Sequence, residues 1–220
     1  MKVLTHPSFK FEEELWDKGF THVIGIDEVG RGAFAGPVVA ASVIFENGTK
    51  FSDLFLNRVN DSKLLRPRER EMLSKEITNL TNLWSISEIP VKTINKVGIG
   101  KATATAMRQC VKQVLLNPRH DKNIYFLLVD GFHIKFVREL GLKNQKAIIK
   151  GDQKSISIAS ASIIAKVYRD KLMKNYGRKF TFYNFGVNKG YGTKLHQKAM
   201  KEHGLCPIHR TSFNLSKFLQ

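Results

Sequence analysis

The sequence is poor in cysteine, poor in acidic residues and free of long apolar runs. Only two of its 220 residues are cysteines, Cys110 and Cys206, and they form no redox or metal-binding motif. We therefore predict a reducing, cytoplasmic location, with both thiols as ordinary packing residues. The longest apolar runs, 37–45 and 124–129, are far shorter than the ~20 residues that span a bilayer. Acidic residues between positions 12 and 17 also exclude a signal peptide.

The scarcity of acidic residues gives the chain a strong and uneven positive charge. Against 36 Lys and Arg stand 19 Asp and Glu, a formal net charge of +17. Residues 1–60 hold 8 acids and 6 bases, residues 61–220 hold 11 and 30, and the last 80 residues hold 3 and 16. Such a field attracts nucleic acid or an anionic membrane surface. We favour nucleic acid as the partner; a merely solubilising surface is the alternative.

The order of apolar patterns predicts an α/β domain. The first two expected strands form a hairpin, and the strands after it alternate with helices. Strands are expected at 22–29, 37–45, 83–89, 123–129 and 146–150. Helices are expected at 66–79, 100–116 and 155–175, and a last one runs from a cap at Thr193 to Gly204. We predict one domain over 1–220, a mixed five-stranded sheet flanked by helices, with a helical C-terminal portion over about 176–220.

The most informative residues are acids in apolar surroundings. Asp27 and Glu28 end an apolar strand before a Gly-Arg-Gly turn, Asp130 ends the most apolar strand, and Asp152 follows the fifth strand. Ligands of open α/β sheets bind where strands end. Converging carboxylates would repel one another unless cations or raised pKa values relieve the repulsion. Oxygen-only ligands favour Mg²⁺ or Mn²⁺, and a carboxylate-held metal pair on a basic protein suggests phosphodiester chemistry.

A structural interpretation of these acids stays open at this level. A single Asp at a strand end is often a turn or cap residue. Adjacent residues of a regular strand also face opposite ways, so Asp27 and Glu28 share a site only if the strand bends or ends there. Asp170 is excluded, because Lys166 and Lys174 lie four residues to either side, the spacing of ordinary helical ion pairs.

Seven blocks, in order, resemble the ribonuclease HII family, the bacterial type 2 ribonucleases H. They lie between about residue 20 and residue 213, and they read GIDEVGRG (25–32), DSK (61–63), VDG (129–131), KGD (150–152), ASASIIAKVYRD (159–170), GYGT (190–193) and HRTSF (209–213). The sequence departs from the common family pattern at Leu205-Cys206 and in the Ala-Ser-Ala-Ser stretch, and neither place touches an acid or the Gly-Arg-Gly turn.

The resemblance implies a ribonuclease H-like fold and an endoribonuclease that cleaves RNA in RNA–DNA hybrids and at single ribonucleotides embedded in duplex DNA. Incision would fall 5′ to the ribonucleotide and leave a 3′-hydroxyl and a 5′-phosphate. Two divalent ions, Mg²⁺ or Mn²⁺, would be held by the catalytic acids Asp27, Glu28, Asp130 and Asp152. The implied substrate contacts are Gly30, Arg31, Gly32, Ser62, Lys63 and Tyr191. The turn would read the 2′-hydroxyl and the adjacent phosphate, and Tyr191 the next deoxyribose.

Several alternatives remain beside this hypothesis. Lys63, Lys150, Lys154 and Lys189 hold phosphates or are solvated surface residues. Ser62 is a phosphate contact or a turn residue, His196 and His209 are more simply structural than ligands, and Arg210 organises the C-terminal fold. The sister family, ribonuclease HIII, carries an extra N-terminal domain, and only about 20 residues precede Thr21 here. A basic nucleic-acid binder without activity is the other alternative. We expect a monomer.

Overall fold

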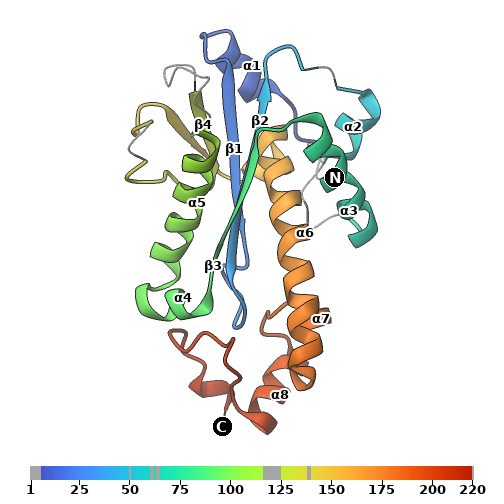
Figure 1. Ribbon diagram of the computed structural model, residues 1–220, viewed down its shortest axis with the longest axis vertical. Helices are drawn as coiled ribbons and strands as arrows, with labels where there is room; N and C mark the ends of the chain where they lie inside the picture. The colour runs from blue at the N-terminus through green and yellow to red at the C-terminus, as the bar shows by residue number, and fades with distance from the viewer. Residues whose placement is uncertain are drawn as a thin grey trace, which may run out of the picture.

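Five strands form one mixed sheet in the computed structural model of the chain, which describes residues 6–49, 51–59, 62, 65–115, 125–137 and 140–219. The strand order is β3-β2-β1-β4-β5, and Figure 1 shows the central strands between α5 and α6. The strands are β1 (His22–Val29), β2 (Val38–Glu46), β3 (Trp84–Ile89), β4 (Tyr125–Asp130) and β5 (Gln145–Ile148). The predicted α/β class and the five-stranded sheet are confirmed.

Strand β1 is the centre of the sheet. It pairs antiparallel with β2, with Gly25 opposite Val43, and parallel with β4, with Ile26 opposite Val129. The predicted β1–β2 hairpin is therefore confirmed. Residues 22–27 of β1 are all buried, and so are residues 38–45 of β2. Strands covered on both faces read as continuous apolar sequence rather than as an alternation, which is why the sequence located them so well.

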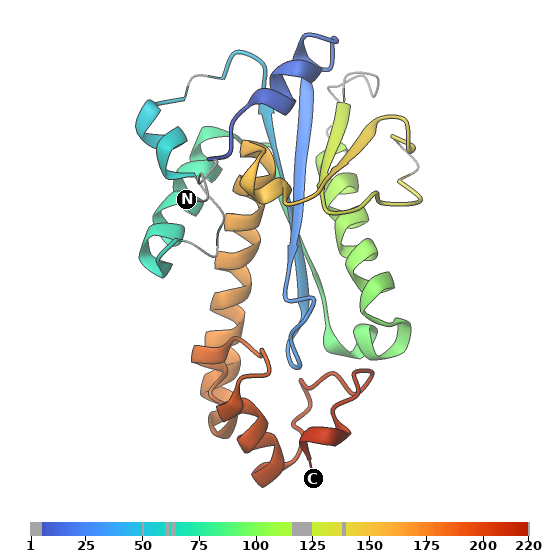
Figure 2. The ribbon, with the colours of Figure 1, turned by 180° about the vertical axis from the view of Figure 1, so that it is seen from behind.

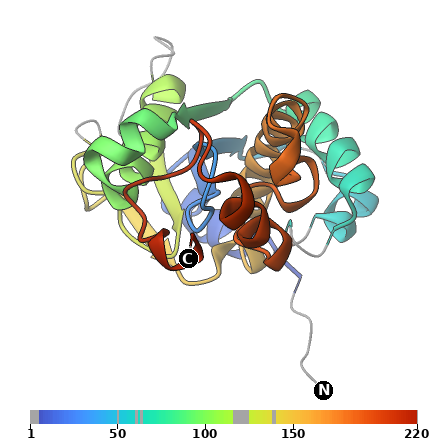
Figure 3. The same ribbon diagram turned by 90° about the horizontal axis from the view of Figure 1, so that it is seen from below.

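Helices cover both faces of the sheet. Helix α5 packs on one face and the long helix α6 on the other, with the strands between them in Figure 3. The helices are α1 (Lys10–Trp16), α2 (Asp53–Arg58), α3 (Pro67–Leu80), α4 (Val91–Val97), α5 (Ile99–Leu115), α6 (Ile156–Lys179), α7 (Phe185–Asn188) and α8 (Lys194–His203). No helix in the described ranges has both the length and the apolar character needed to cross a membrane.

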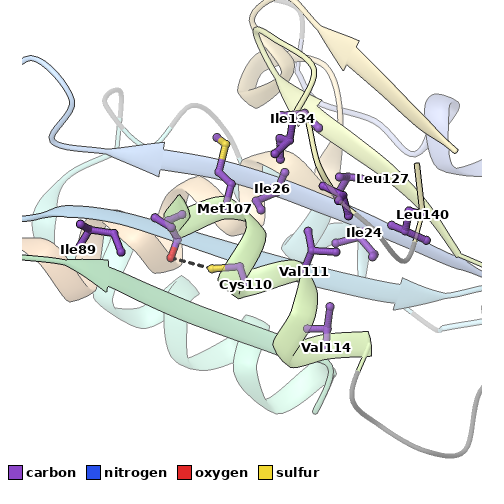
Figure 4. Packing of buried hydrophobic residues seen from close by; sticks show 14 of the residues in the cluster. Ile24, Ile26, Ile89, Met107, Cys110, Val111, Val114, Leu127, Ile134 and Leu140 are labelled. Carbon is purple, nitrogen blue, oxygen red and sulfur yellow. Dashed lines mark hydrogen bonds between the residues drawn. The ribbon is translucent and has the colours of Figure 1, made fainter. Parts of the chain in front are cut away.

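The core on the α5 side is drawn in Figure 4. Met107, Cys110 and Val111 of α5 lie over Ile24 and Ile26 of β1 in one buried cluster. The Cys110 thiol donates to the Ala40 carbonyl at 3.3 Å, and burial raises its pKa to about 12. A thiol that stays protonated and surrounded by apolar atoms is a packing residue, as predicted for Cys110.

Helix α6 connects the sheet to the C-terminal portion. Its first half lies on the sheet, and its second half runs past the strands to the last helices, seen at the bottom of Figure 2. Short 3-10 turns complete this portion at Gly151–Gln153, Thr181–Tyr183 and Ser216–Phe218. A separate apolar cluster holds it together, with Met173 of α6, Phe185 of α7 and Met200 of α8 at its centre.

Some element boundaries differ from the prediction. Helices α1, α2 and α4 were not predicted; each has at most seven residues and so carries little periodic signal. Helix α6 continues to Lys179 instead of ending near 175, and the expected loop 181–192 contains α7. Strand β5 ends at Ile148 rather than at 150, where Lys150 takes a left-handed backbone (φ 55°) that no strand accommodates.

A buried carboxylate at the start of α6 was also not foreseen. Glu12 of α1 is fully buried, and its Oε1 accepts hydrogen bonds from the Ser155 hydroxyl at 2.6 Å and from the Ser157 hydroxyl and amide at 2.6 and 3.0 Å. Burial raises the pKa of Glu12, and these hydrogen bonds oppose the rise. A negative group at a helix N-terminus is favourable, so Glu12 ties α1 to α6.

Gly25 sets how closely α6 approaches the sheet. A Cβ added there would lie 2.2 Å from the carbonyl carbon of Ser157, so Gly25→Ala must push α6 away. We expect the free energy of unfolding to fall by about 3 kcal/mol in denaturant titrations. Gly100 of α5 has no atom within 4 Å of its Cβ position, so Gly100→Ala should be neutral or stabilising by up to ~1 kcal/mol. Equal stability of the two variants would contradict this account.

Candidate active site

The strand ends bring the predicted acids to one edge of the sheet. Asp27 and Glu28 lie near the end of β1, Asp130 is the last residue of β4, and Asp152 lies in the 3-10 turn that follows β5. These three strands are neighbours and run parallel. Their carboxyl ends therefore meet at the same edge, as the sequence predicted.

Three of the four acids line one cavity of about 450 Å³, here called the acid cavity. Its lining residues are Asp27, Glu28, Val29, Ser62, Asp130, Ser162, Lys166 and Tyr191. Pairing of β1 with β4 stops at Ile26, while pairing with β2 continues to Val29. Asp27 and Glu28 therefore lie in the part of β1 that is paired on one side only, and both line the cavity.

The carboxyl group of Asp27 is buried and lies close to two other acids. Its side chain is only 5% exposed. Burial, followed by the charges of Glu28 and Asp130, raises the pKa of Asp27 well above its ordinary value, and a hydrogen bond from Ser162 opposes the rise. A cation bound at this place would relieve both the burial cost and the repulsion.

Asp152 is buried but does not line the acid cavity with the other three. It is tied to them through the backbone, because the amide of Gly151 donates to Asp130 Oδ1 at 2.6 Å. Among the described residues, no three His, Cys, Asp or Glu side chains are grouped as metal ligands. The donors of the four acids are all hard oxygens, which suits Mg²⁺ or Mn²⁺.

The Gly-Arg-Gly turn lies beside the acid cavity. Gly30 has a φ of +88°, and a Cβ there would lie 2.1 Å from Arg169 Nε, so glycine is required both for the conformation and for the contact. The Arg31 side chain is 52% exposed, lies 3.9 Å from Glu28 Oε1, and stacks over Phe132 at 5.3 Å. Gly32 is open on the Cβ side.

Two fully buried arginines hold this turn in place. Arg169 of α6 donates to the carbonyls of Pro37 (2.9 Å), Lys189 (2.9 Å) and Ala35 (3.1 Å). Arg210 donates to the carbonyls of Gly36 and Arg31, both at 2.9 Å. Arg210 thus reaches beyond the C-terminal portion that it was predicted to organise. Arg169 was missed, although it stands in the block 159–170.

Tyr191 enters the acid cavity from the C-terminal portion. The guanidinium of Arg169 lies 5.6 Å from the centre of the Tyr191 ring. The backbone amide of Tyr191 donates to the Asn188 carbonyl at 3.0 Å. The Nδ1 of His196 donates to the Tyr191 carbonyl at 2.9 Å. Tyr191 is therefore held from three sides at the place where the sequence predicted a substrate contact.

The two histidines form a proton-ordered pair. Because a carbonyl only accepts, His196 carries its proton on Nδ1 and accepts on Nε2, where His209 Nε2 donates at 3.0 Å. His209 Nδ1 then accepts from the Cys206 amide at 2.9 Å, a shorter contact than the 3.3 Å to the Cys206 carbonyl. Both rings are buried. They have the structural role that was weighed against metal ligation.

Two predicted substrate contacts remain, Ser62 and Lys63. Ser62 is buried in the acid cavity, its hydroxyl 2.9 Å from that of Ser162, and its carbonyl accepts from Arg70 at 2.7 Å. Lys63 lies outside the described residues. Ser162 and Lys166 were not predicted as lining residues. Their spacing of four residues within one helix, in the same block as Arg169, was the signal that could have identified them.

Solved structures of known proteins share this fold. The ribonuclease H2 of Pyrococcus horikoshii matches with a TM-score of 0.68 at 25% identity, over 90% of this chain and 97% of that one. A Bst ribonuclease HIII crystallised with Mn²⁺ matches with a TM-score of 0.73 at 18% identity, over 93% of this chain and 71% of that one. The fold and the acid cavity define a ribonuclease H-like, metal-dependent nuclease.

Sequence comparison narrows this class to one family. The family model for ribonuclease HII matches residues 24–216. The ribonuclease HII of Pelodictyon phaeoclathratiforme is 43% identical over 205 residues, which are 93% of this chain and 95% of that protein. The chain belongs to the ribonuclease HII family. It is a divalent-metal-dependent endonuclease that hydrolyses RNA in RNA–DNA hybrids.

The histidine pair predicts a loss of stability in mild acid. Burial, together with the charge of His196, lowers the pKa of His209 to about 4, whereas the unfolded chain takes up that proton near 6.5. Acidification between these values therefore favours the unfolded state, by about 3 kcal/mol once pH 4 is passed.

The test compares the wild type with His209→Gln, which keeps a donor and an acceptor but cannot titrate. Unfolding free energies measured from pH 7 to pH 4 should fall more steeply for the wild type. As control, His203→Asn removes a half-exposed histidine of α8 and should leave the wild-type profile unchanged. Parallel profiles of wild type and His209→Gln would refute the role of the pair.

Proposed function

We propose that the chain also incises duplex DNA on the 5′ side of a single embedded ribonucleotide, leaving a 3′-hydroxyl and a 5′-phosphate. The observation that carries this proposal is the acid cavity itself. Its buried Asp27 has a pKa raised by burial and by the charges of Glu28 and Asp130. Tyr191 lines the same cavity, and the half-exposed side chain of Arg31 lies beside Glu28. A carboxylate-lined cavity on a strongly basic protein suits attack on a phosphodiester.

Asp27, Glu28, Asp130 and Asp152 would hold two divalent cations, Mg²⁺ or Mn²⁺. The chemistry supplied by such cations is activation of a water and stabilisation of charge on the leaving oxygen. Within the protein, Ser162 orients Asp27 by hydrogen bonding. The Gly151 amide fixes Asp130 and so keeps Asp152 beside it. These contacts support the four-acid assignment.

The Gly-Arg-Gly turn and Tyr191 would read the RNA–DNA junction. Gly30 keeps the turn packed on Arg169, and Gly32, whose Cβ position is open, leaves room for a sugar and phosphate to approach the backbone. A 2′-hydroxyl is what distinguishes RNA from DNA. Arg31, held beside Glu28, would meet the adjacent phosphate, and Tyr191 the deoxyribose that follows. Ser62 and Lys63 would contact phosphate, although the Ser62 hydroxyl already pairs with Ser162.

The single-domain organisation is part of the same proposal. Residues 1–220 would act as one catalytic unit and as a monomer, with about 176–220 as a substrate-binding extension. Arg169 and Arg210 support this view, because their hydrogen bonds connect residues 31–37 to α6 and to the C-terminal portion.

The catalytic assignment is tested by Asp130→Asn. The variant keeps the side-chain size and an oxygen for the Gly151 amide but loses the charge. We therefore expect a native unfolding transition and a cleavage rate lower by at least ~100-fold. The assay follows a labelled DNA duplex with one ribonucleotide in Mg²⁺, in Mn²⁺ and in chelator.

The matched control is Asp17→Asn, which removes an exposed acid after α1 and should leave the rate unchanged. Retained cleavage by pure Asp130→Asn protein would refute the four-acid assignment. Tight binding without incision in either metal would show that the wild type is a nucleic-acid binder without junction activity.

The role of Tyr191 is tested by comparing Tyr191→Ala with Tyr191→Phe. Loss of the ring should reduce the ratio of incision at single ribonucleotides to cleavage of all-RNA hybrids by roughly tenfold, the order of 1–2 kcal/mol of lost aromatic contact. Tyr191→Phe keeps the ring and should behave like the wild type. Equal losses on both substrates for Tyr191→Ala would contradict a junction-reading role.

A further inference from the structure

A second cavity, of about 260 Å³, lies between α3, α6 and α7. We call it the basic cavity, because its charged lining residues are four cations and two carboxylates: Arg70, Lys166, Lys174, Lys189, Glu71 and Asp170. The helices that form it lie side by side in Figures 1 and 2. None of the contacts of the proposed catalytic function explains why four cations gather here.

The basic cavity adjoins the acid cavity. Lys166 of α6 lines both of them. Lys189 lines the basic cavity and Tyr191, two residues on, lines the acid cavity. The backbone between them is fixed, since Lys189 has a left-handed conformation (φ 53°) and its carbonyl accepts from Arg169 at 2.9 Å. One loop therefore forms a wall of each cavity.

The internal ion pairs do not balance the charge of the basic cavity. Asp170 is shared by Lys166 at 2.6 Å and Arg70 at 3.6 Å, and Glu71 lies 3.5 Å from Lys174. The amine of Lys189 donates to the neutral carbonyl of Gly186. Burial lowers the pKa of Lys189, Asp170 opposes this, and the charges of Lys174, Lys166 and Arg70 lower it further. An anion bound among these groups would relieve their mutual repulsion.

We propose that the basic cavity binds one backbone phosphate of the nucleic-acid substrate, a near neighbour of the phosphate that is cleaved at the acid cavity. This inference rests on the proposed function, because the second phosphate is placed relative to the first. Lys174 and Lys189 are the principal donors. Arg70 is already committed to the carbonyls of Ser62 and Leu65, and Lys166 to Asp170. Arg70 therefore also links the basic cavity to Ser62 in the acid cavity.

A nucleic-acid backbone fits this geometry better than a free anion. Its phosphates come at regular intervals along one strand, and the two cavities share a wall. A phosphate held at the basic cavity would set the register of the strand, and so decide which phosphodiester faces Asp27. Contacts of this kind position a nucleic acid without reading its bases.

The experiment neutralises the two principal donors, Lys174 and Lys189, and measures binding of the uncleaved duplex in chelator across a salt series. Lys174→Gln with Lys189→Gln should weaken binding by on the order of tenfold, and should reduce the slope of log affinity against log salt by about 1. The control removes two exposed lysines of α5, on the opposite face of the sheet, as Lys101→Gln with Lys112→Gln. It should change the slope much less.

A second arm identifies the phosphate. Neutral methylphosphonate linkages are placed one at a time on either side of the ribonucleotide. One position near the scissile phosphate should weaken binding by the wild type and the α5 control, but not by the double-Gln variant. Equal losses in all three proteins, or no position-specific loss in the wild type, would overturn the proposal.

Two further comparisons keep the outcomes separate. The double variant Lys174→Arg with Lys189→Arg keeps both charges and should bind like the wild type. If the double-Gln variant is destabilised, the single variant Lys174→Gln replaces it, because the Lys174 side chain is half-exposed. Wild-type incision in Mg²⁺ is measured in parallel. A wild type that fails to incise refutes the proposed function, whereas normal incision with an unchanged double-Gln variant refutes only the phosphate site.

Discussion

The site depends on two buried guanidinium groups that hydrogen-bond to backbone carbonyls. Burying a charge is costly unless it is well hydrogen-bonded, and burial lowers the pKa of Arg210 to about 9, helped by the charge of Arg169. Arg169 meets three carbonyls and Arg210 meets two. These bonds join residues 31–37, between β1 and β2, to α6 and the C-terminal portion. The Gly-Arg-Gly turn and Tyr191 are therefore positioned by the same pair of side chains.

Charged residues of both signs lie close to Arg169 and Arg210. On one side, Asp27 is buried beside Glu28 and Asp130, so bound cations would relieve the repulsion among the carboxylates of the acid cavity. On the other side, the basic cavity gathers more cations than its carboxylates neutralise. Lys166 and the loop 189–191 form the boundary between them. A phosphodiester chain with bound metal ions is complementary to both halves, which connects the uneven charge of the sequence to the family's substrate.

The histidine pair shows how a buried polar group supports the site without entering the chemistry. Each ring nitrogen has a defined donor or acceptor role, from the Cys206 amide through His209 and His196 to the Tyr191 carbonyl. Aromatic rings surround the pair, with Phe185 at 5.2 Å from His196. A satisfied polar chain within an apolar cluster specifies one arrangement, and here it specifies where Tyr191 lies.

The sequence alone determined the sheet, the main helices and the positions of the acids, because buried strands and glycine turns are local signals that survive in the chain. It also carried the seven family blocks. It did not reveal short helices such as α2 or the role of Glu12, nor that Arg169 holds a turn more than 130 residues away. Only the tertiary structure decided that Asp27 and Glu28 line one cavity with Asp130 while Asp152 lies outside its lining, since these acids come from segments far apart in the chain. Contacts between distant segments are set by packing, and a linear pattern does not encode them residue by residue.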